Sequence, residues 1–151
     1  MAKYKKTIRR KKAPSYITGD FRKFNPKKYK GDLSKPIRYR SGYELRFMHQ
    51  LENNKNVEWW NFENIIIPYI YEARNGERKR HNYIMDFQVK MKNSGLYLCE
   101  VKPANKVPLN ESQINKTPDH RRNAFKWKAA IKWCQLNNHQ FKIITEKDLN
   151  I

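Results

Sequence analysis

A chain of 151 residues is long enough for one domain with a hydrophobic core and too short for several large ones. It carries 33 Lys and Arg residues against 14 Asp and Glu residues, giving a formal net charge of +19 and a pI of about 10.0. Such a charge attracts polyanions, above all nucleic acid. Because the sequence has no apolar run that could cross a bilayer and no signal-peptide pattern, we expect a soluble, intracellular protein without a membrane partner.

Cysteine and histidine usage excludes two further classes of protein. Only two cysteines occur, Cys99 and Cys134, and we expect both to be reduced packing residues rather than a disulfide framework. The four histidines are scattered and lack zinc-like spacing. A structural zinc site is therefore not expected.

Residues 1–35 read as a basic, partly disordered arm, and residues 36–151 as the folded domain. The first dozen residues are rich in Lys and Arg and poor in aliphatic side chains, which is typical of a segment that stays disordered when free. Aromatic residues are interleaved with the basic ones further along. They could pack on the domain, stack on bases or dock to a partner protein, whereas a solvated tail would only raise solubility.

A helix is predicted to begin after Ser41. Ser41 and Glu44 fit a capping box, and an apolar stripe at spacings of three and four follows: Tyr43, Phe47, Met48 and Leu51. Glu44 has two interpretations. It could reach back to the backbone N–H of Ser41, or it could face inward and complete a metal site.

The remaining pattern predicts an α/β (α+β) fold with a mixed sheet. After a short extended segment, Val57 to Trp60, we expect strands over 65–71, 81–90 and 96–102, a connection over 103–119, a helix over 121–135 and a strand over 141–145. The first three strands would form an antiparallel meander. The last would join in parallel through a right-handed helical crossover, with helices covering both faces.

The segment from Asp86 to Lys102 carries the chemistry. Two runs of alternating apolar and polar residues flank Asn93-Ser94-Gly95. This pattern predicts a hairpin with Gly95 in the left-handed backbone region. Paired residues in an antiparallel ladder point to the same face about 5 Å apart. The predicted register therefore brings together Asp86, Glu100 and Lys102, through the pairs Lys92 with Leu96, Gln88 with Glu100, and Asp86 with Lys102.

Two carboxylates this close raise each other's pKa unless a cation neutralises them. A divalent cation is the natural choice, and oxygen ligands without a Cys/His set favour Mg²⁺ or Mn²⁺ over zinc. The alternative interpretation is an ordinary solvent-facing hairpin that carries charges.

An acid on the first helix, Glu44, an acid that opens one strand, Asp86, and a Glu-x-Lys on the next, Glu100 and Lys102, together resemble the PD-(D/E)xK superfamily of nucleases. The resemblance implies a restriction-endonuclease-like core. Met85 stands where the name-giving proline often lies, but that proline binds no metal.

Within the superfamily, the string from Tyr39 to Met48 looks like the opening of TnsA-type transposon endonucleases and, more closely, of tailed-phage head-completion nucleases. The likeness covers roughly residues 29–149. It continues through Trp60, Ile66-Ile67-Pro68-Tyr69, Asp86-Phe87, Glu100-Val101-Lys102-Pro103, Lys126-Trp127 and Ile144-Thr145-Glu146. The Ile-Pro-Tyr strand, the short chain and the Lys/Tyr-rich arm favour the phage family.

The resemblance implies a metal-dependent DNA nuclease that acts in phage head completion, before heads join tails. Because no recognisable base-reading module is visible in the sequence, we expect low sequence specificity. It implies catalytic roles for Glu44, Asp86, Glu100 and Lys102. Asp86, Glu100, Glu44 and the backbone carbonyl of Val101 would hold Mg²⁺, for which Mn²⁺ would substitute. The implied partners are DNA and a phage head, portal or neck protein, in the host cytoplasm during assembly, with retention in the virion neck as a further expectation.

Phosphate contacts supply affinity without sequence information. The candidates for DNA binding are Lys126 and Arg122 on the second helix, Lys106 and Lys116 in the long connection, and Gln88 on the predicted site face. Each lysine or arginine also reads as a solvated surface charge, and Gln88 as a satisfied strand residue. His81 could titrate near neutral pH, but nothing in its spacing requires a catalytic role.

Two alternative functions remain open at this stage. One is a transposon-end or junction-cleaving endonuclease of the same superfamily. The other is a non-catalytic nucleic-acid-binding or virion structural protein, for which the charge of +19 is a sufficient explanation.

Overall fold

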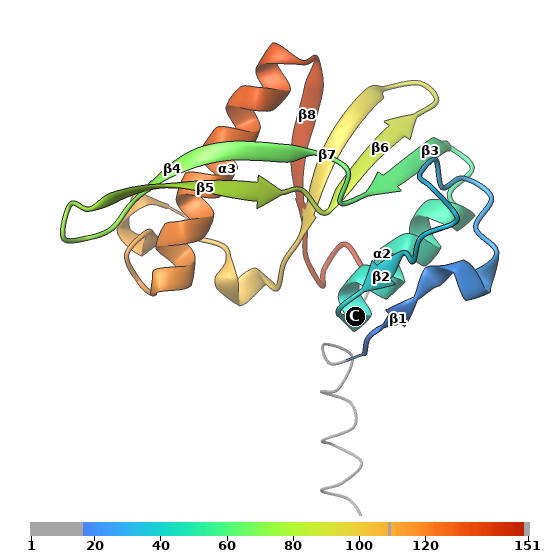
Figure 1. The fold of residues 1–151 in the computed structure, drawn as a ribbon, viewed down its shortest axis with the longest axis horizontal. Helices are drawn as coiled ribbons and strands as arrows, with labels where there is room; N and C mark the ends of the chain where they lie inside the picture. The colour runs from blue at the N-terminus through green and yellow to red at the C-terminus, as the bar shows by residue number, and fades with distance from the viewer. Residues whose placement is uncertain (1–16, 109, 150–151) are drawn as a thin grey trace, which may run out of the picture.

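The computed structural model of the protein describes residues 17–108 and 110–149, and Figure 1 shows its fold. The N-terminal elements are β1 (Gly19–Asp20), η2 (Phe21–Phe24), β2 (Arg38–Tyr39) and α2 (Gly42–Asn53). They are followed by β3 (Val57–Phe62), β4 (Ile66–Glu72), β5 (Arg78–Ile84), β6 (Phe87–Met91), β7 (Gly95–Val101), η3 (Ala104–Lys106), η4 (Glu111–Gln113), α3 (Pro118–Leu136) and β8 (His139–Ile144). The mixed α/β class predicted from the sequence is confirmed.

The main sheet has four strands in the order β3-β6-β7-β8. The β3/β6 and β6/β7 pairs are antiparallel, and β8 pairs with β7 in parallel after the chain has crossed over through α3. The predicted parallel closing strand is therefore confirmed. Helix α3 begins at Pro118, three residues earlier than expected, because the Thr117 hydroxyl accepts a hydrogen bond from the His120 N–H (3.1 Å) and caps the helix.

The predicted meander is divided between two sheets. Its two antiparallel pairings are present, β4 with β5 and β6 with β7, but β4 and β5 form a separate ribbon, and β3 takes the edge of the main sheet next to β6. The predicted strand over 81–90 is interrupted at Met85 and Asp86. Two hydrogen bonds hold ribbon and sheet together at this bend, from Glu63 N–H to Asp86 O (2.9 Å) and from Met85 N–H to Ile65 O (2.9 Å). Glu63 turns the chain there with a left-handed φ of 53°.

The hairpin between β6 and β7 also corrects the predicted register. Leu96 faces Lys90 instead of Lys92, so the pairing has moved by two residues. A shift of two leaves every side chain on its predicted face, because the side-chain period of a strand is two. Gly95 has a positive φ of 94°, as the turn prediction required. Phe87 faces Cys99, and the next residues outward along the two strands are Asp86 and Glu100.

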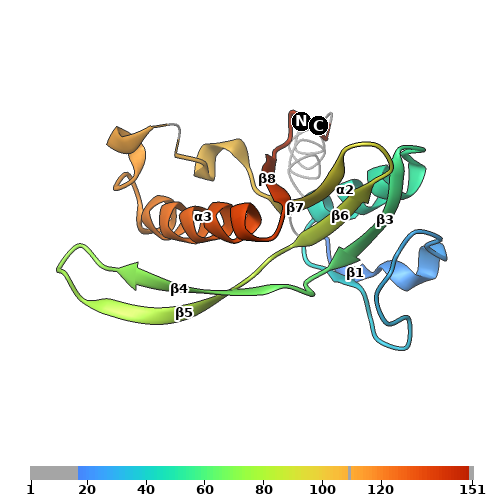
Figure 2. The same ribbon diagram turned by 90° about the horizontal axis from the view of Figure 1, so that it is seen from above.

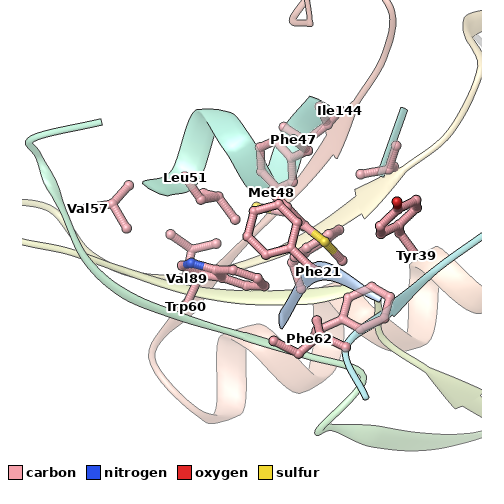
Figure 3. Close-up of a cluster of buried hydrophobic side chains, with 14 of the residues drawn as sticks. Phe21, Tyr39, Phe47, Met48, Leu51, Val57, Trp60, Phe62, Val89 and Ile144 are labelled. Carbon is pink, nitrogen blue, oxygen red and sulfur yellow. The ribbon is translucent and has the colours of Figure 1, made fainter. Parts of the chain in front are cut away.

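Two hydrophobic clusters lie on opposite faces of the main sheet. One joins α2 to the sheet and is drawn in Figure 3; its members include Phe47, Met48, Leu51, Trp60, Phe87, Val89 and Ile144. The other joins α3 to the sheet and the ribbon, and it includes Ile67, Tyr69, Tyr83, Leu98, Trp127, Ala130 and Cys134. The expected covering of both faces by helices is confirmed. Within the described residues, no helix combines the length and apolar character needed to cross a bilayer.

The described part of the N-terminal segment is fastened to the domain. Phe21 is only 1% exposed and belongs to the α2 cluster. The Glu52 carboxylate accepts hydrogen bonds from the backbone N–H groups of Lys27 (2.7 Å) and Lys28 (3.0 Å) and from Trp60 Nε1 (2.7 Å). Residues 1–16 of the expected basic arm lie outside the described residues, and a domain boundary near residue 35 stays a prediction.

Candidate active site

Asp86 lies at the bend between β5 and β6, where the ribbon leaves the main sheet. Its side chain is half-buried, and Oδ2 accepts a hydrogen bond from the backbone N–H of Val101 (2.9 Å). The acid of one strand is thus bonded to the last residue of the neighbouring strand. This contact places the carboxylate beside the Glu100-Val101-Lys102 segment, as the hairpin prediction required.

Glu100 supplies a second carboxylate from β7. The residue is only 4% exposed. Its Oε1 lies 3.7 Å from Lys102 Nζ, while Oε2 is buried and has no hydrogen-bond partner among the described residues. A buried carboxylate oxygen without a donor is costly, because the water it has lost is not replaced. That oxygen is free to bind a ligand.

Glu44 comes from the first turn of α2. Its backbone N–H donates to the Ser41 hydroxyl (3.1 Å), which confirms Ser41 as the helix cap. The glutamate does not close the expected capping box on Ser41, because its Oε1 accepts instead from the backbone N–H of Arg40 (2.7 Å). Burial raises the pKa of Glu44, and Glu63 and Glu100 add to the rise.

The three acids influence one another electrostatically. Burial raises the pKa of Asp86 well above its usual value, and the negative charges of Glu100 and Glu44 raise it further. Among the described residues, no three His, Cys, Asp or Glu side chains are already arranged as a set of metal ligands. Two features nevertheless fit a divalent cation: the donors are all oxygen atoms, and Glu100 Oε2 is unpaired.

Lys126 lies near this cluster, where it interacts electrostatically with Glu100 and Asp86. Its Nζ lies 5.2 Å from the centroid of the Tyr83 ring. Burial lowers the pKa of Lys126, and the nearby positive charges of Lys102 and Arg122 lower it further, whereas Glu100 opposes the shift. Lys126 is therefore a second ammonium group near the acids, in addition to the Lys102 beside Glu100.

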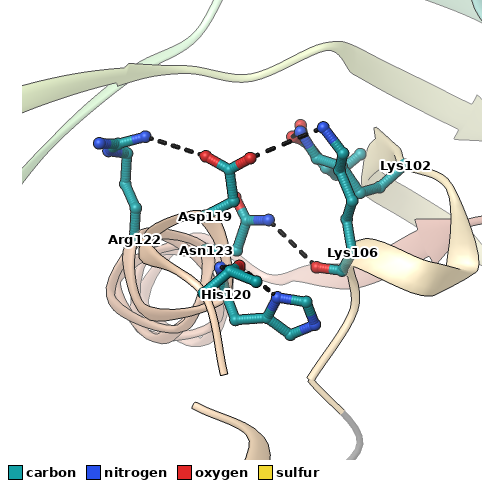
Figure 4. Close-up of polar contacts among 8 residues, drawn as sticks. Lys102, Lys106, Asp119, His120, Arg122 and Asn123 are labelled. Atoms are coloured by element: carbon teal, nitrogen blue, oxygen red, sulfur yellow. Dashed lines mark hydrogen bonds and ion pairs between the residues drawn. The ribbon is translucent and has the colours of Figure 1, made fainter. Parts of the chain in front are cut away.

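Asp119 forms ion pairs with two of the residues predicted to bind DNA, Lys106 and Arg122 (Figure 4). Lys106 Nζ lies 3.6 Å from its Oδ2, and Arg122 lies 3.3 Å from its Oδ1. All three side chains are about half exposed, so these ion pairs are weak. Asn123 donates to the Lys106 carbonyl (3.3 Å) and anchors the connection on α3.

Three other predicted residues lie elsewhere. Lys116 is exposed and lines a pocket of about 400 Å³ between the ribbon and the start of α3. The Gln88 side chain forms hydrogen bonds with two neighbours. Its Oε1 accepts a hydrogen bond from Asn64 Nδ2 (2.9 Å), and its Nε2 lies 3.0 Å from His139 Nε2. His81 stacks on Tyr69 in the ribbon. None of the three is bonded to the acid cluster through a contact between described residues.

Comparison with known proteins identifies the family. The family model described as "TnsA-like endonuclease N terminal" matches residues 54–146, which include Asp86, Glu100 and Lys102. The chain belongs to the TnsA-like endonuclease family. A relative, the head completion nuclease of Enterobacteria phage T4, is 31% identical over 136 residues, a match that covers 83% of this chain and 88% of the relative. The nuclease relationship predicted from the sequence is confirmed, and with it the restriction-endonuclease-like fold.

This TnsA-like chain also places two residues at the site that the sequence analysis did not single out. Tyr83 Oη and Trp127 Nε1 are, with Glu100 Oε2, the buried side-chain polar atoms that lack hydrogen-bond partners in the described part of the chain. Burial raises the pKa of Tyr83, and Glu100 and Asp86 raise it further, so the phenol stays neutral. No sequence signal marks Tyr83, because its position depends on the strand break at Met85 and Asp86.

Proposed function

We propose that this TnsA-like protein is a deoxyribonuclease that hydrolyses phosphodiester bonds with the help of Mg²⁺ and with low sequence specificity. One observation supports the proposal most strongly. Asp86 accepts a hydrogen bond from the Val101 N–H, and Val101 lies between Glu100 and Lys102, whose side chains form an ion pair. Mn²⁺ is expected to substitute for Mg²⁺, because both are hard cations that accept oxygen ligands.

We assign the roles as follows. Asp86, Glu100 and the Val101 carbonyl would hold the cation, and Glu44 would join them directly or through water. When bound, Mg²⁺ lowers the pKa of a coordinated water and withdraws charge from the phosphate. Lys102, a compact ammonium with movable donors, would orient the attacking water or neutralise developing charge.

Substrate binding would depend mainly on phosphate contacts. Lys126 lies near the acids and would touch phosphates close to the scissile bond, while Lys106 and Arg122 would exchange Asp119 for phosphate oxygens. Lys116 would reach phosphates further along the duplex. Gln88 is the weakest of the predicted contacts, because its amide already bonds to its neighbours.

For the biological role we propose phage head completion before head-tail joining, in the host cytoplasm. The support is the T4 relative, which is named a head completion nuclease and which this chain matches over most of both lengths. A head, portal or neck protein is the partner that this role requires, and retention in the virion neck would follow from such docking.

The decisive experiment is a cleavage assay on supercoiled and linear DNA with Mg²⁺, Mn²⁺ or EDTA. We expect Asp86→Asn and Lys102→Met to lose at least about 100-fold in rate, since each removes a charge at the reacting phosphate. Glu77→Gln and Lys92→Met, which change exposed residues outside the site, are the matched controls and should cut like wild type. Cleavage that persists in EDTA, or in the Asp86→Asn variant, would contradict the assignment.

The family match also favours a second candidate, a transposon-end or junction-cleaving endonuclease, because the matching family model is described as TnsA-like. A panel of linear, branched and junction substrates separates the two functions. A head-completion nuclease should cut plain duplex as fast as branched DNA. A strong preference for branched DNA would favour the second candidate.

A further inference from the structure

The β4/β5 ribbon extends away from the rest of the molecule (Figures 1 and 2). One of its faces packs on α3 through Ile67, Tyr69 and Tyr83. Arg121 on α3 also donates to the Glu72 carbonyl (2.8 Å), so the ribbon is held along its length and not only at its base. In Figure 2, α3 lies along one side of the ribbon, and no other described element covers the opposite side.

That opposite side, which we call the open face, is apolar near the base and basic toward the tip. The strand register places Ile66 beside Ile84 and Ile70 beside Arg80, followed by Glu72 beside Arg78. The three isoleucines are 44% to 58% exposed. A sheet face with this much exposed aliphatic surface is typical of a binding surface.

The tip half of β5 is a run of exposed cations. Arg78, Lys79 and Arg80 are all exposed, and none of them forms an ion pair with another described residue. By contrast, Asp119 neutralises Lys106 and Arg122 nearer the acids. Alternation along the strand points Arg78 and Arg80 to the open face and Lys79, which pairs with Tyr71, to the α3 side. The two arginines on a projecting strand form a surface complementary to a polyanion.

The ribbon leads into the candidate active site, because β5 ends at Ile84, two residues before Asp86. Arg80 and Arg78 precede Asp86 by six and eight residues, or about 20 to 26 Å of extended strand. Phosphates of one DNA strand follow one another about every 3.4 Å along the axis, so this distance corresponds to about six to eight base pairs. The major groove is wide enough to admit a two-stranded ribbon.

We propose that the open face of the ribbon, with Arg78 and Arg80, binds the major groove of duplex DNA about six to eight base pairs to one side of the scissile phosphate. Arg78 and Arg80 contact phosphates, and the isoleucines contact sugars. Such contacts carry little sequence information, in agreement with low specificity. This inference rests on the proposed function, since it takes the Asp86 cluster as the cutting site.

The test compares two triple variants in metal-free binding assays. Arg78→Ala/Lys79→Ala/Arg80→Ala removes the basic run, and Lys55→Ala/Lys92→Ala/Lys132→Ala removes three exposed lysines elsewhere, with the same loss of charge. On a duplex of about 30 base pairs, the ribbon variant should bind roughly tenfold or more weakly, and the slope of log affinity against log salt should fall by about 2 to 3. The control variant should change that slope by less than about 1.

Duplex length supplies a second readout. A stem-loop with about 5 base pairs is too short to span from the acid cluster to the ribbon tip, so the affinity ratio of wild type to ribbon variant should fall. Equal effects of the two triple variants, or a ratio independent of length, would overturn the proposal. An unchanged affinity of the ribbon variant, together with a change in solution mass on Ile66→Ser/Ile70→Ser, would assign the open face to contacts between protein chains instead.

The outcomes for ribbon and active site are distinguishable. If wild type cuts DNA in Mg²⁺ and the ribbon variant binds as wild type does, the ribbon proposal fails alone. If wild type neither binds nor cuts duplex DNA, the proposed function itself fails.

Discussion

Glu44, Asp86 and Glu100 bring negative charge into a partly buried region, and this arrangement opposes folding in the absence of a cation. The pKa of Asp86 rises because of burial first and because of Glu100 and Glu44 second. Glu100 Oε2 is buried without a donor. Such a cluster has no evident stabilising role, whereas binding a cation and a phosphate requires it.

The raised pKa of Asp86 predicts an unusual dependence of stability on pH. The folded, metal-free protein holds this proton more tightly than the unfolded chain, so its free energy of unfolding should fall as pH rises above the ordinary carboxyl pKa of 3.8. Asp86→Asn removes the carboxyl group and with it this loss of stability. Urea unfolding in EDTA should therefore show a higher free energy of unfolding for the variant than for wild type at neutral pH. The difference should become smaller toward pH 4, and also when Mg²⁺ is added to wild type.

Asp20 provides a control of opposite sign. Its hydrogen bond with the Arg22 side chain, together with backbone N–H donors, lowers the pKa of this carboxyl to about 2. Asp20→Asn should therefore lower stability at neutral pH, and its effect should fade as pH falls toward 2. A stability difference between wild type and Asp86→Asn that grows toward acid pH would contradict the Asp86 prediction.

At the scale of elements, the structure shows why part of the fold was predictable. The face of each acid followed from alternation in β6 and β7, and a two-residue error in register left it unchanged. Strand β3 was expected only as a short extended segment from Val57 to Trp60, because a register shift between Val57 and Trp59 disrupts its alternation. The break at Met85 and Asp86 was invisible, because the apolar pattern runs through it without interruption.

Glu52 is one of the residues through which α2 holds the N-terminal segment. We expect Glu52→Ala to lower the free energy of unfolding by about 1 to 3 kcal/mol, since it leaves the N–H of the buried Trp60 indole without an acceptor. It should also expose the backbone around Lys27 and Lys28 to proteolysis. Glu58→Ala, which changes an exposed acid on β3, is the control, and equal stabilities of the two variants in urea would contradict the assigned role.

For the molecule as a whole, part of the net charge of +19 is concentrated in two places, near the acids and along β5. Lys102, Lys126 and Arg122 lie near the acids, and the basic run of β5 extends from the same region. The sequence indicated Lys102 through the family resemblance, and Lys126 and Arg122 as basic residues of the second helix. It could not predict the ribbon, because pairing of β4 with β5 outside the main sheet depends on a bend that local pattern does not encode.

Because the proposed DNA contacts are made mainly with phosphates, we expect binding that is strong, salt-dependent and nearly independent of sequence. Duplexes of unrelated sequence should bind in EDTA with affinities within about threefold of one another, and all should weaken steeply between low and physiological salt. Fluorescence anisotropy with several duplexes measures both properties. One sequence preferred by about 100-fold would indicate base-specific readout and would contradict this prediction.

The parallel pairing of β7 with β8 has a consequence for synthesis of the protein. The strand that carries Glu100 receives its outer neighbour from residues 139–144, and Lys102 N–H donates to the Ile144 carbonyl (2.9 Å). A nascent chain from which this segment has not yet emerged therefore lacks one side of the strand that carries Glu100. We expect cutting power only after residues 139–144 have left the ribosome, so chains truncated before them should not cleave DNA.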